Sequence, residues 1–211
     1  MTTRNLDALF RPRSIALIGA SNAPGSIGQI LAENLLSGGF DGPVLPVNPH
    51  AATIRSTLAY PSVAALPIAP DLAVIATPAP TVPGLIAELG ARGCRAAVVI
   101  SAGLSGPDLR QQLLDASRPH LLRIVGPNCL GFISPGIGVN ASFAQLTPRP
   151  GGLALVAQSG AITTAALDWA DGRGLGFSHV VTLGDMAEVD FGDLLDYLAL
   201  DTETKAILLY V

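Results

Sequence analysis

Gly19, Gly25 and Gly28 lie within one ten-residue stretch, interspersed with serine, asparagine and proline. An apolar run over residues 14–18 precedes them, and residues 29–37 after them have the composition of a helix. Glycine lets the backbone approach a bound anion, and a helix N-terminus offers unpaired N–H groups and the positive end of its dipole. Residues 19–28, the glycine loop, therefore predict a site for the phosphates of a nucleotide-bearing ligand, with a plain tight turn as the alternative.

The spacing of these glycines does not fit the common nucleotide-binding motifs. A dinucleotide-binding fold needs Gly-x-Gly-x-x-Gly and an acidic residue at the end of the second strand. The gap from Gly19 to Gly25 is too wide, and the second strand, predicted over residues 43–47, ends in Val47-Asn48-Pro49 without an acid. A Walker loop needs Gly-Lys-Ser/Thr, which is absent. NAD is therefore a disfavoured alternative, and Walker-type ATP binding is less favoured still.

The composition indicates strands that are covered on both faces. Of 211 residues, 49% are hydrophobic and only 13% are charged, and the mean hydropathy is +0.49. The apolar runs are broken well before the roughly 18 residues that a transmembrane helix needs, and the N-terminus lacks a signal core. A net charge of −4 argues against a nucleic-acid partner, and two distant cysteines argue against zinc or disulfides. We therefore expect a cytoplasmic protein with no metal and no membrane segment.

Strands and helices are predicted to alternate along the first 146 residues, after a short leader at residues 6–10. The further predicted elements are strands at 71–77, 96–100 and 122–125 and helices at 82–92 and 107–117. Such alternation at short intervals is typical of a doubly wound parallel sheet. We therefore expect residues 1–146 to form one Rossmann-like α/β domain.

The alternation breaks at residues 133–150, where Pro135, Pro148 and Pro150 predict a connection. It then restarts, with strands predicted at 152–157, 177–183 and 205–211 and helices at 161–171 and 191–200. The apolar last strand has nothing in this chain to cover it, so residues 147–211 are expected to form the start of a second α/β domain, cut short.

Ligands of open α/β sheets bind beyond the carboxyl ends of the strands. In the first predicted domain these ends carry small, polar or proline-bearing residues, which together predict one long crevice, although each alone is compatible with an ordinary turn. The predicted binding residues are Gly19, Ala20, Ser21, Gly25, Ser26, Gly28, Val47, Asn48, Pro49, Thr77, Pro78, Ala79, Ser101, Ala102, Gly103, Asn128 and Cys129.

A series of short motifs resembles one family in its order and spacing. The motifs occupy residues 18–21, 24–28, 47–49, 60–62, 71–75, 101–103, 126–131, 140–143 and 158–161. They are similar to those of the ADP-forming (NDP-forming) acyl-CoA synthetases, which are relatives of the succinyl-CoA synthetase α subunit. The same module opens bacterial protein lysine acetyltransferases that fuse it to an acetyltransferase domain.

The resemblance implies that the first domain binds coenzyme A (CoA). The glycine loop and residues 47–49 would meet its nucleotide and pyrophosphate, residues 77–79 and 101–103 its pantetheine arm, and residues 128–129 its thiol end. The second domain would be flavodoxin-like and would bind the phosphate of a phosphohistidine at a helix N-terminus. The residues implied there are Gln158, Ser159, Gly160 and Ala161. Because the first 200 residues contain no lysine, Arg11, Arg13, Arg55 or backbone amides are left for the 3′-phosphate of CoA.

The family implies conversion of acyl-CoA, ADP and phosphate to acid, CoA and ATP through an acyl phosphate and a phosphohistidine. ADP or ATP and Mg would be bound by a separate ATP-grasp domain or subunit. The family's histidine lies beyond residue 211, and His50, His120 and His179 do not match its position, so no catalytic residue is predicted in this chain and the fragment alone is expected to be inactive.

Two further expectations follow from the resemblance. The family's Gly-Asn is replaced here by Gly184-Asp185, which would bring a carboxylate near the path of the phosphate. The alternative function is a CoA- or nucleotide-sensing regulatory module of a protein lysine acetyltransferase, without ligase turnover.

Overall fold

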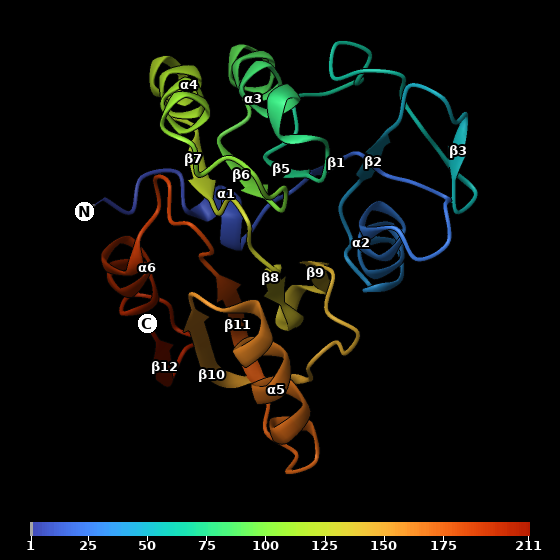
Figure 1. Ribbon diagram of the computed structural model, residues 1–211. Coiled ribbons are helices and arrows are strands. Elements are labelled where there is room, and N and C mark those ends of the chain that lie inside the picture. Colours follow the sequence, from blue (N-terminus) through green and yellow to red (C-terminus); the bar gives the residue numbers. More distant parts are fainter. Residues whose placement is uncertain (1) are drawn as a thin grey trace.

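A computed structural model describes residues 2–211 as two halves, each built on its own sheet (Figure 1). In the first half the strands are all parallel and follow the order β2-β1-β5-β6-β7. Their bounds are β1 Ile15–Ile18, β2 Val44–Val47, β5 Leu72–Ile75, β6 Ala96–Val99 and β7 Arg123–Val125. The chain turns from β1 to β2 on one side and then to β5 on the other, so the strand order reverses between β1 and β5. Such a reversal opens a crevice at the carboxyl ends of the strands.

Helices cover both faces of this sheet, because successive strand residues point to opposite sides. Ala16 and Ile18 of β1 face α3 (Val82–Ala91) and α4 (Pro107–Ser117). Ile15 and Leu17 of the same strand face α1 (Asp7–Phe10) and α2 (Ile27–Ser37). Strands covered on both faces are apolar at every position, which confirms the predicted Rossmann-like, doubly wound sheet. The shorter elements of this half are β3 Thr53–Ile54, β4 Thr57–Leu58, η1 Ala79–Thr81 and η2 Arg118–His120.

The second half has a mixed sheet in the order β12-β10-β11-β8-β9. Its parallel strands are β10 Pro150–Ala157, β11 Phe177–Thr182 and β12 Ala206–Tyr210, and its antiparallel hairpin is β8 Gly131–Ser134 and β9 Val139–Ser142, joined by η3 Pro135–Ile137. Residues of α5 (Gly160–Asp171) pack on one face, whereas α6 (Phe191–Leu198) packs on the other.

The β8–β9 hairpin lies where the sequence predicted only a connection, over residues 133–150. Phe132 and Ile133 point to opposite faces of the second sheet and fill a different core on each. The buried polar side chains of the hairpin satisfy one another, since Ser142 Oγ donates to Asn140 Oδ1 at 2.6 Å. The prolines that suggested a coil lie in the turn and the flanks. The hairpin thus belongs to the second sheet, while the boundary between residues 146 and 147 stays a prediction.

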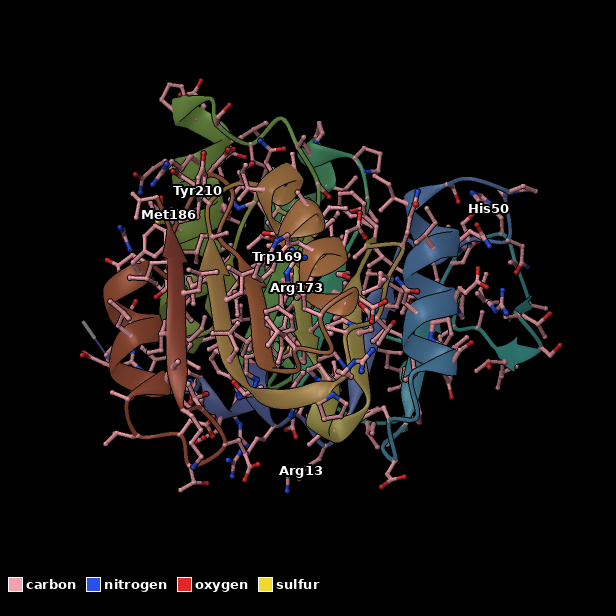
Figure 2. All side chains as sticks on the ribbon, turned by 90° about the horizontal axis from the view of Figure 1, so that it is seen from below. Arg13, His50, Trp169, Arg173, Met186 and Tyr210 are labelled. Atoms are coloured by element: carbon pink, nitrogen blue, oxygen red, sulfur yellow. The ribbon has the colours of Figure 1, made fainter. Side chains whose placement is uncertain are left out.

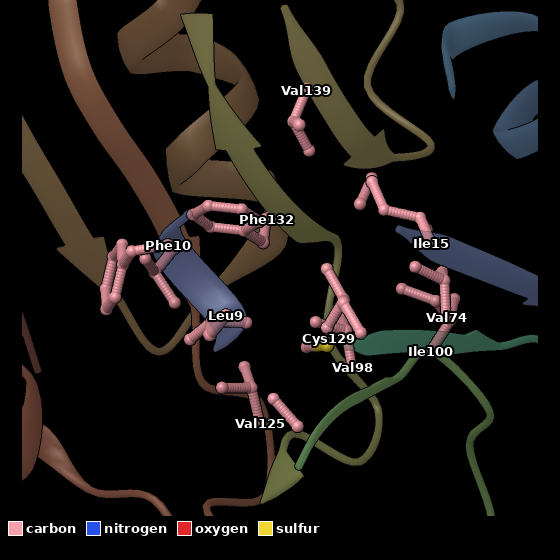
Figure 3. Close-up of a cluster of buried hydrophobic side chains, with 14 of the residues drawn as sticks. Leu9, Phe10, Ile15, Val74, Val98, Ile100, Val125, Cys129, Phe132 and Val139 are labelled. Atoms are coloured by element: carbon pink, nitrogen blue, oxygen red, sulfur yellow. The ribbon is translucent and has the colours of Figure 1, made fainter. Parts of the chain in front are cut away.

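One hydrophobic core continues from the first half into the second. Figure 3 shows Leu9 of α1 between Val125 of the first sheet and Phe132 of the second, with Phe10 beside Phe132. The Phe10 ring packs edge-on against Phe132, with 5.4 Å between centroids. The leader predicted at residues 6–10 therefore packs between the two sheets and joins their cores.

A buried arginine forms the polar part of the same junction. Arg123 of β7 is 2% exposed, and its Nε donates to Glu188 at 2.8 Å while its Nη2 donates to Asp193 at 2.7 Å. Its Nη1 donates to the carbonyl oxygens of Thr2 and Arg4. One side chain of the first half thus binds the N-terminal segment before the leader and two carboxylates of the second half.

His179 of β11 is also buried at this junction. Its ring lies against Phe10 with 4.8 Å between centroids, and its Nδ1 is 3.1 Å from Ser134 Oγ. Its Nε2 is 3.3 Å from Asp201 Oδ2 but in a geometry that makes no hydrogen bond. Burial lowers the pKa of His179, and the charge of Asp201 only partly opposes this effect.

We expect the free energy of unfolding to decrease as the pH falls below 6.5, the ordinary pKa of histidine. In that range the unfolded chain binds a proton that the buried imidazole of His179 resists, so stability is lost on acidification. The contribution is at most about 1.4 kcal/mol per pH unit. Urea unfolding at about pH 7.5 and about pH 5.5 measures it. His179→Gln should show a smaller difference between the two pH values, and an equal difference in both proteins would contradict the prediction.

Candidate functional site

The glycine loop connects β1 to α2 at the point where the strand order reverses. Gly19 has φ +91°, and a Cβ placed there would lie 2.6 Å from the carbonyl oxygen of Ala76, at the end of β5. A Cβ on Gly28, in the first turn of α2, would lie 2.1 Å from the carbonyl oxygen of Gly19. Both positions therefore require glycine, because neighbouring backbone lies too close to leave room for a side chain. The packing brings the N-terminus of α2 directly onto the end of β1.

Two serines order the loop between these glycines. Ser26 caps α2, since its Oγ accepts from Gln29 N at 3.2 Å and donates to the carbonyl oxygen of Ala23 at 2.8 Å. Ser21 Oγ accepts from Ala23 N at 3.0 Å. The first N–H groups of a helix have no partner within the helix. The loop therefore holds the N-terminal amides of α2 in place at the crevice, where they can bind an anion.

Asn48 fixes the end of β2 to the glycine loop. Its Nδ2 donates to the carbonyl oxygen of Ala20 at 2.7 Å, and its Oδ1 accepts from His50 N at 2.7 Å and Ala51 N at 3.0 Å. The predicted binding residue Asn48 is thus a positioning residue, because its side-chain amide is used within the protein. Ala20 and Val47 are buried, so their side chains are not open to a ligand.

The ends of β5 and β6 are joined in the same way. Ser101 Oγ donates to the carbonyl oxygen of Thr77 at 2.6 Å, and Thr77 Oγ1 is 2.8 Å from Thr81 Oγ1. Gly103 approaches Ala79, whose Cβ would be 3.6 Å from a Cβ on the glycine. The predicted residues 77–79 and 101–103 therefore form one continuous rim beside the glycine loop.

Asn128 and Cys129 follow β7, but their side chains differ in access. Asn128 is exposed, its N–H donates to the carbonyl oxygen of Ser101 at 3.0 Å, and its Nδ2 donates to Asp185 Oδ1 at 3.1 Å. Cys129 is 4% exposed with Sγ 3.4 Å from the carbonyl oxygen of Val99, and burial raises its pKa to about 12. Asn128 can therefore contact a ligand with its side chain, whereas the buried, protonated thiol of Cys129 is not suited to act as a nucleophile.

The second predicted group lies at the N-terminus of α5. Ser159 Oγ accepts from Ile162 N at 3.5 Å, and Gln158 N donates to the carbonyl oxygen of Tyr210. A Cβ on Gly160 would be 3.3 Å from the Cβ of Leu130, two residues beyond Asn128. The start of α5 therefore lies beside the loop that follows β7.

Gly184 and Asp185 complete this meeting point from the end of β11. A Cβ on Gly184 would be 2.2 Å from the carbonyl oxygen of Pro127, and Asp185 N donates to the same oxygen at 2.9 Å. Arg110 of α4 holds the segment by donating to the carbonyl oxygen of Met186 at 3.1 Å. The two predicted groups of site residues thus come together in the loop over residues 128–130, where Gly160 lies beside Leu130 and Asp185 accepts a hydrogen bond from Asn128.

Not all candidate residues lie at this edge of the molecule. Figure 2 shows Arg13 at the opposite end from His50, Met186 and Tyr210. Arg11 and Arg13 precede β1 and are paired with Asp201 and Asp71. They line a wide hollow of about 1390 Å³ at that opposite end, which contains none of the predicted binding residues. Both arginines are therefore excluded as partners of a ligand on the glycine loop.

Sequence reasoning missed Asn22, which connects the glycine loop to the β3–β4 hairpin. Its Nδ2 donates to the carbonyl oxygen of Thr53 at 2.8 Å, and its Oδ1 accepts from Arg55 N at 3.1 Å. An asparagine between glycines indicates a turn held by side-chain hydrogen bonds. The partners of Asn22 could not be identified from this signal, because they lie more than thirty residues away in the sequence.

Two protein families match successive parts of the chain. The family described as "CoA binding domain" matches residues 13–135, which contain the glycine loop and the rim residues. The chain belongs to the CoA-binding domain family. The family described as "Succinyl-CoA ligase like flavodoxin domain" matches residues 150–211, in agreement with the flavodoxin-like fold expected for the second half.

Relatives of this CoA-binding protein cover nearly the whole chain. It is 41% identical to "Acetate--CoA ligase [ADP-forming] I" of Archaeoglobus fulgidus, over 98% of this chain and 30% of the relative. It is 38% identical to "Acetate--CoA ligase [ADP-forming] I subunit alpha" of Pyrococcus furiosus, over 98% of this chain and 47% of the relative. The chain therefore spans less than half the length of these relatives.

A solved structure confirms the fold of both halves together. The "dinucleotide forming Acetyl-coenzyme A synthetase 1 in complex with phosphate and ADP" of Ca. Korarchaeum cryptofilum is 35% identical, with a TM-score of 0.93 over 98% of this chain and 45% of that one. Among residues 2–211, no helix has the length and apolar character needed to span a bilayer.

Proposed function

We propose that these residues are the CoA-binding part of an ADP-forming acyl-CoA synthetase. The full reaction would convert acyl-CoA, ADP and phosphate to acid, CoA and ATP. The observation that supports the proposal is that the carboxyl edge of the first sheet has an anion-binding helix start at two places. The amides of α2 lie at the end of β1, and the start of α5 lies beside Leu130 in the loop that follows β7. The ADP-forming acetate–CoA ligases that match the chain support the same reaction class. The regulatory alternative, within a lysine acetyltransferase, gains no support from these relatives.

In this proposal CoA lies along the carboxyl edge of the first sheet. Its diphosphate binds the amides at the start of α2, where Gly19 and Gly28 leave room for no side chain. Its pantetheine arm follows the rim made by Thr77 and Ser101. Its thiol end reaches Asn128, where the second half begins to contribute.

At the thiol end, the start of α5 would bind the phosphate that attacks the thioester. The dipole and the capped amides beyond Ser159 favour an anion there. Asn128 is held by Asp185 and would orient the thioester. Catalysis by this chain would thus consist of placing the two reactants and stabilising charge.

The remaining chemistry would come from parts that these 211 residues do not contain. A histidine would carry the phosphoryl group to ADP, and an ATP-grasp domain or subunit would bind ADP and Mg. One relative is named as a subunit alpha, which implies that this relative has a partner subunit. We also place the protein in the cytoplasm, where acyl-CoA and ADP are available.

Calorimetry with CoA and with NAD tests the proposal. We expect CoA at millimolar concentration or below to give a binding isotherm and NAD to give none. Replacing Ser21 and Ser26 together by alanine should weaken CoA binding roughly tenfold, because the loop loses a helix cap and an internal hydrogen bond. Ser117→Ala, which removes a hydroxyl from the far end of α4, is the matched control. Binding of NAD without binding of CoA would overturn the proposal.

A further inference from the structure

The strand order fixes which end of CoA lies near which strand. If the thiol end lies at Asn128 beyond β7, the adenosine end must lie at the other side of the glycine loop, beyond β1 and β2. The β3–β4 hairpin is the next element in that direction, and Val47 of β2 pairs with Tyr60 just after it. Figure 1 shows β3 on the outer side of β2, away from β5. A cationic partner of the 3′-phosphate would therefore have to lie on or near this hairpin.

The chain has twelve arginine and lysine residues, and nearly all of them lie elsewhere. Arg11 and Arg13 are at the opposite end, Arg123 is buried, and Arg110 holds the segment after β11. The others away from the hairpin are Arg4 before the leader, Arg92 and Arg95 before β6, Arg118 after α4, and Arg149, Arg173 and Lys205 in the second half. Among residues 2–211, Arg55 is the one arginine or lysine on the β3–β4 hairpin.

Arg55 is held beside the glycine loop by its own backbone. It forms the tip of the hairpin together with Ser56, at φ 45° and 66°, and its N–H donates to Asn22 Oδ1 at 3.1 Å. Its side chain is 39% exposed, and Nη1 lies 3.5 Å from Glu33 Oε2 on α2. The guanidinium is therefore open to a ligand and lies next to the helix whose N-terminus would bind the diphosphate.

We propose that Arg55 binds the 3′-phosphate of CoA, and that Glu33 holds its guanidinium when no ligand is bound. This inference rests on the proposed function, because it takes CoA as the ligand. A phosphate dianion accepts a bidentate, charge-assisted pair of hydrogen bonds from arginine. The single contact with Glu33 is long and partly exposed, so the phosphate displaces it.

Calorimetry with CoA and with dephospho-CoA, which lacks only the 3′-phosphate, tests the assignment. The native chain should bind CoA at least roughly tenfold more tightly than dephospho-CoA. Arg55→Gln should lower the affinity for CoA to that for dephospho-CoA and leave the latter unchanged. Glu33→Gln should tighten CoA binding several-fold, and it should do so only while Arg55 is present.

Two further variants serve as controls. Arg13→Gln removes an exposed, ion-paired arginine from the opposite end and should preserve the preference for CoA. His50→Gln should preserve it as well; if that change abolishes the preference, the assignment to Arg55 is wrong. Equal loss of both ligands in Arg55→Gln, or no loss of either, also overturns it. If the native chain binds neither ligand, the proposed function itself fails, and if it binds both equally, only this inference fails.

Discussion

Replacing Gly28 by valine is expected to abolish CoA binding at millimolar concentration. Even the first added carbon would lie 2.1 Å from the carbonyl oxygen of Gly19, which is a backbone atom and cannot turn away. The start of α2 must then separate from the end of β1, and the amides that would bind the diphosphate move with it. Overpacking of this kind costs about 1–3 kcal/mol of stability as well.

The control for this change is a helix glycine with open space around it. Gly84 lies exposed in α3, and no atom is within 4 Å of the position of its Cβ. Gly84→Ala should keep full CoA binding and raise stability by about 0.5–1 kcal/mol, because alanine favours a helix. Thermal unfolding and calorimetry of both variants measure the effects. A valine variant that remains folded and binds CoA like the native chain would show that the loop is an ordinary turn.

Local patterns were sufficient for most elements of the two sheets. The helix predicted at 107–117 is observed over the same residues, since Gly106 and Pro107 mark its start. The apolar runs that predicted strands match β1, β2, β5, β6 and β7 to within a few residues. They are continuous because a strand covered on both faces is apolar at every position. Gly19 and Gly28 were singled out by their place between a predicted strand and a predicted helix, and the backbone passes close to both.

Long-range pairing explains what the sequence could not show. The β8–β9 hairpin is a strand pair because β8 pairs with β11, with Ile133 opposite Val180, and no local pattern reports that contact. The hydrogen bond from Asn48 to the carbonyl oxygen of Ala20 forms because β2 packs beside β1. The ligand contacts of the rim residues 77–79 and 101–103 remain predictions.

Arg123→Met is expected to lower the free energy of unfolding by about 3–5 kcal/mol. The methionine fills part of the space, but Asp193 and Glu188 lose the cation that neutralises them, and the carbonyl oxygens of Thr2 and Arg4 lose their donor. A buried carboxylate without a partner retains most of its desolvation cost. Urea unfolding followed by circular dichroism measures the change, and Arg13→Met, at an exposed ion pair, should leave the midpoint unaltered.

A rescue experiment tells whether uncompensated charge or lost packing causes the lower stability of Arg123→Met. If uncompensated charge dominates, adding Glu188→Gln and Asp193→Asn to Arg123→Met should recover part of the lost stability, because neutral amides are less costly to bury than unpaired carboxylates. If lost packing at the junction dominates, the triple variant should be no more stable than the single one. A single variant no less stable than the Arg13→Met control would contradict the role of Arg123 altogether. Because Arg123 of β7 binds both the N-terminal segment and the carboxylates of Glu188 and Asp193 in the second half, we also expect its loss to separate the unfolding of the two halves into two transitions.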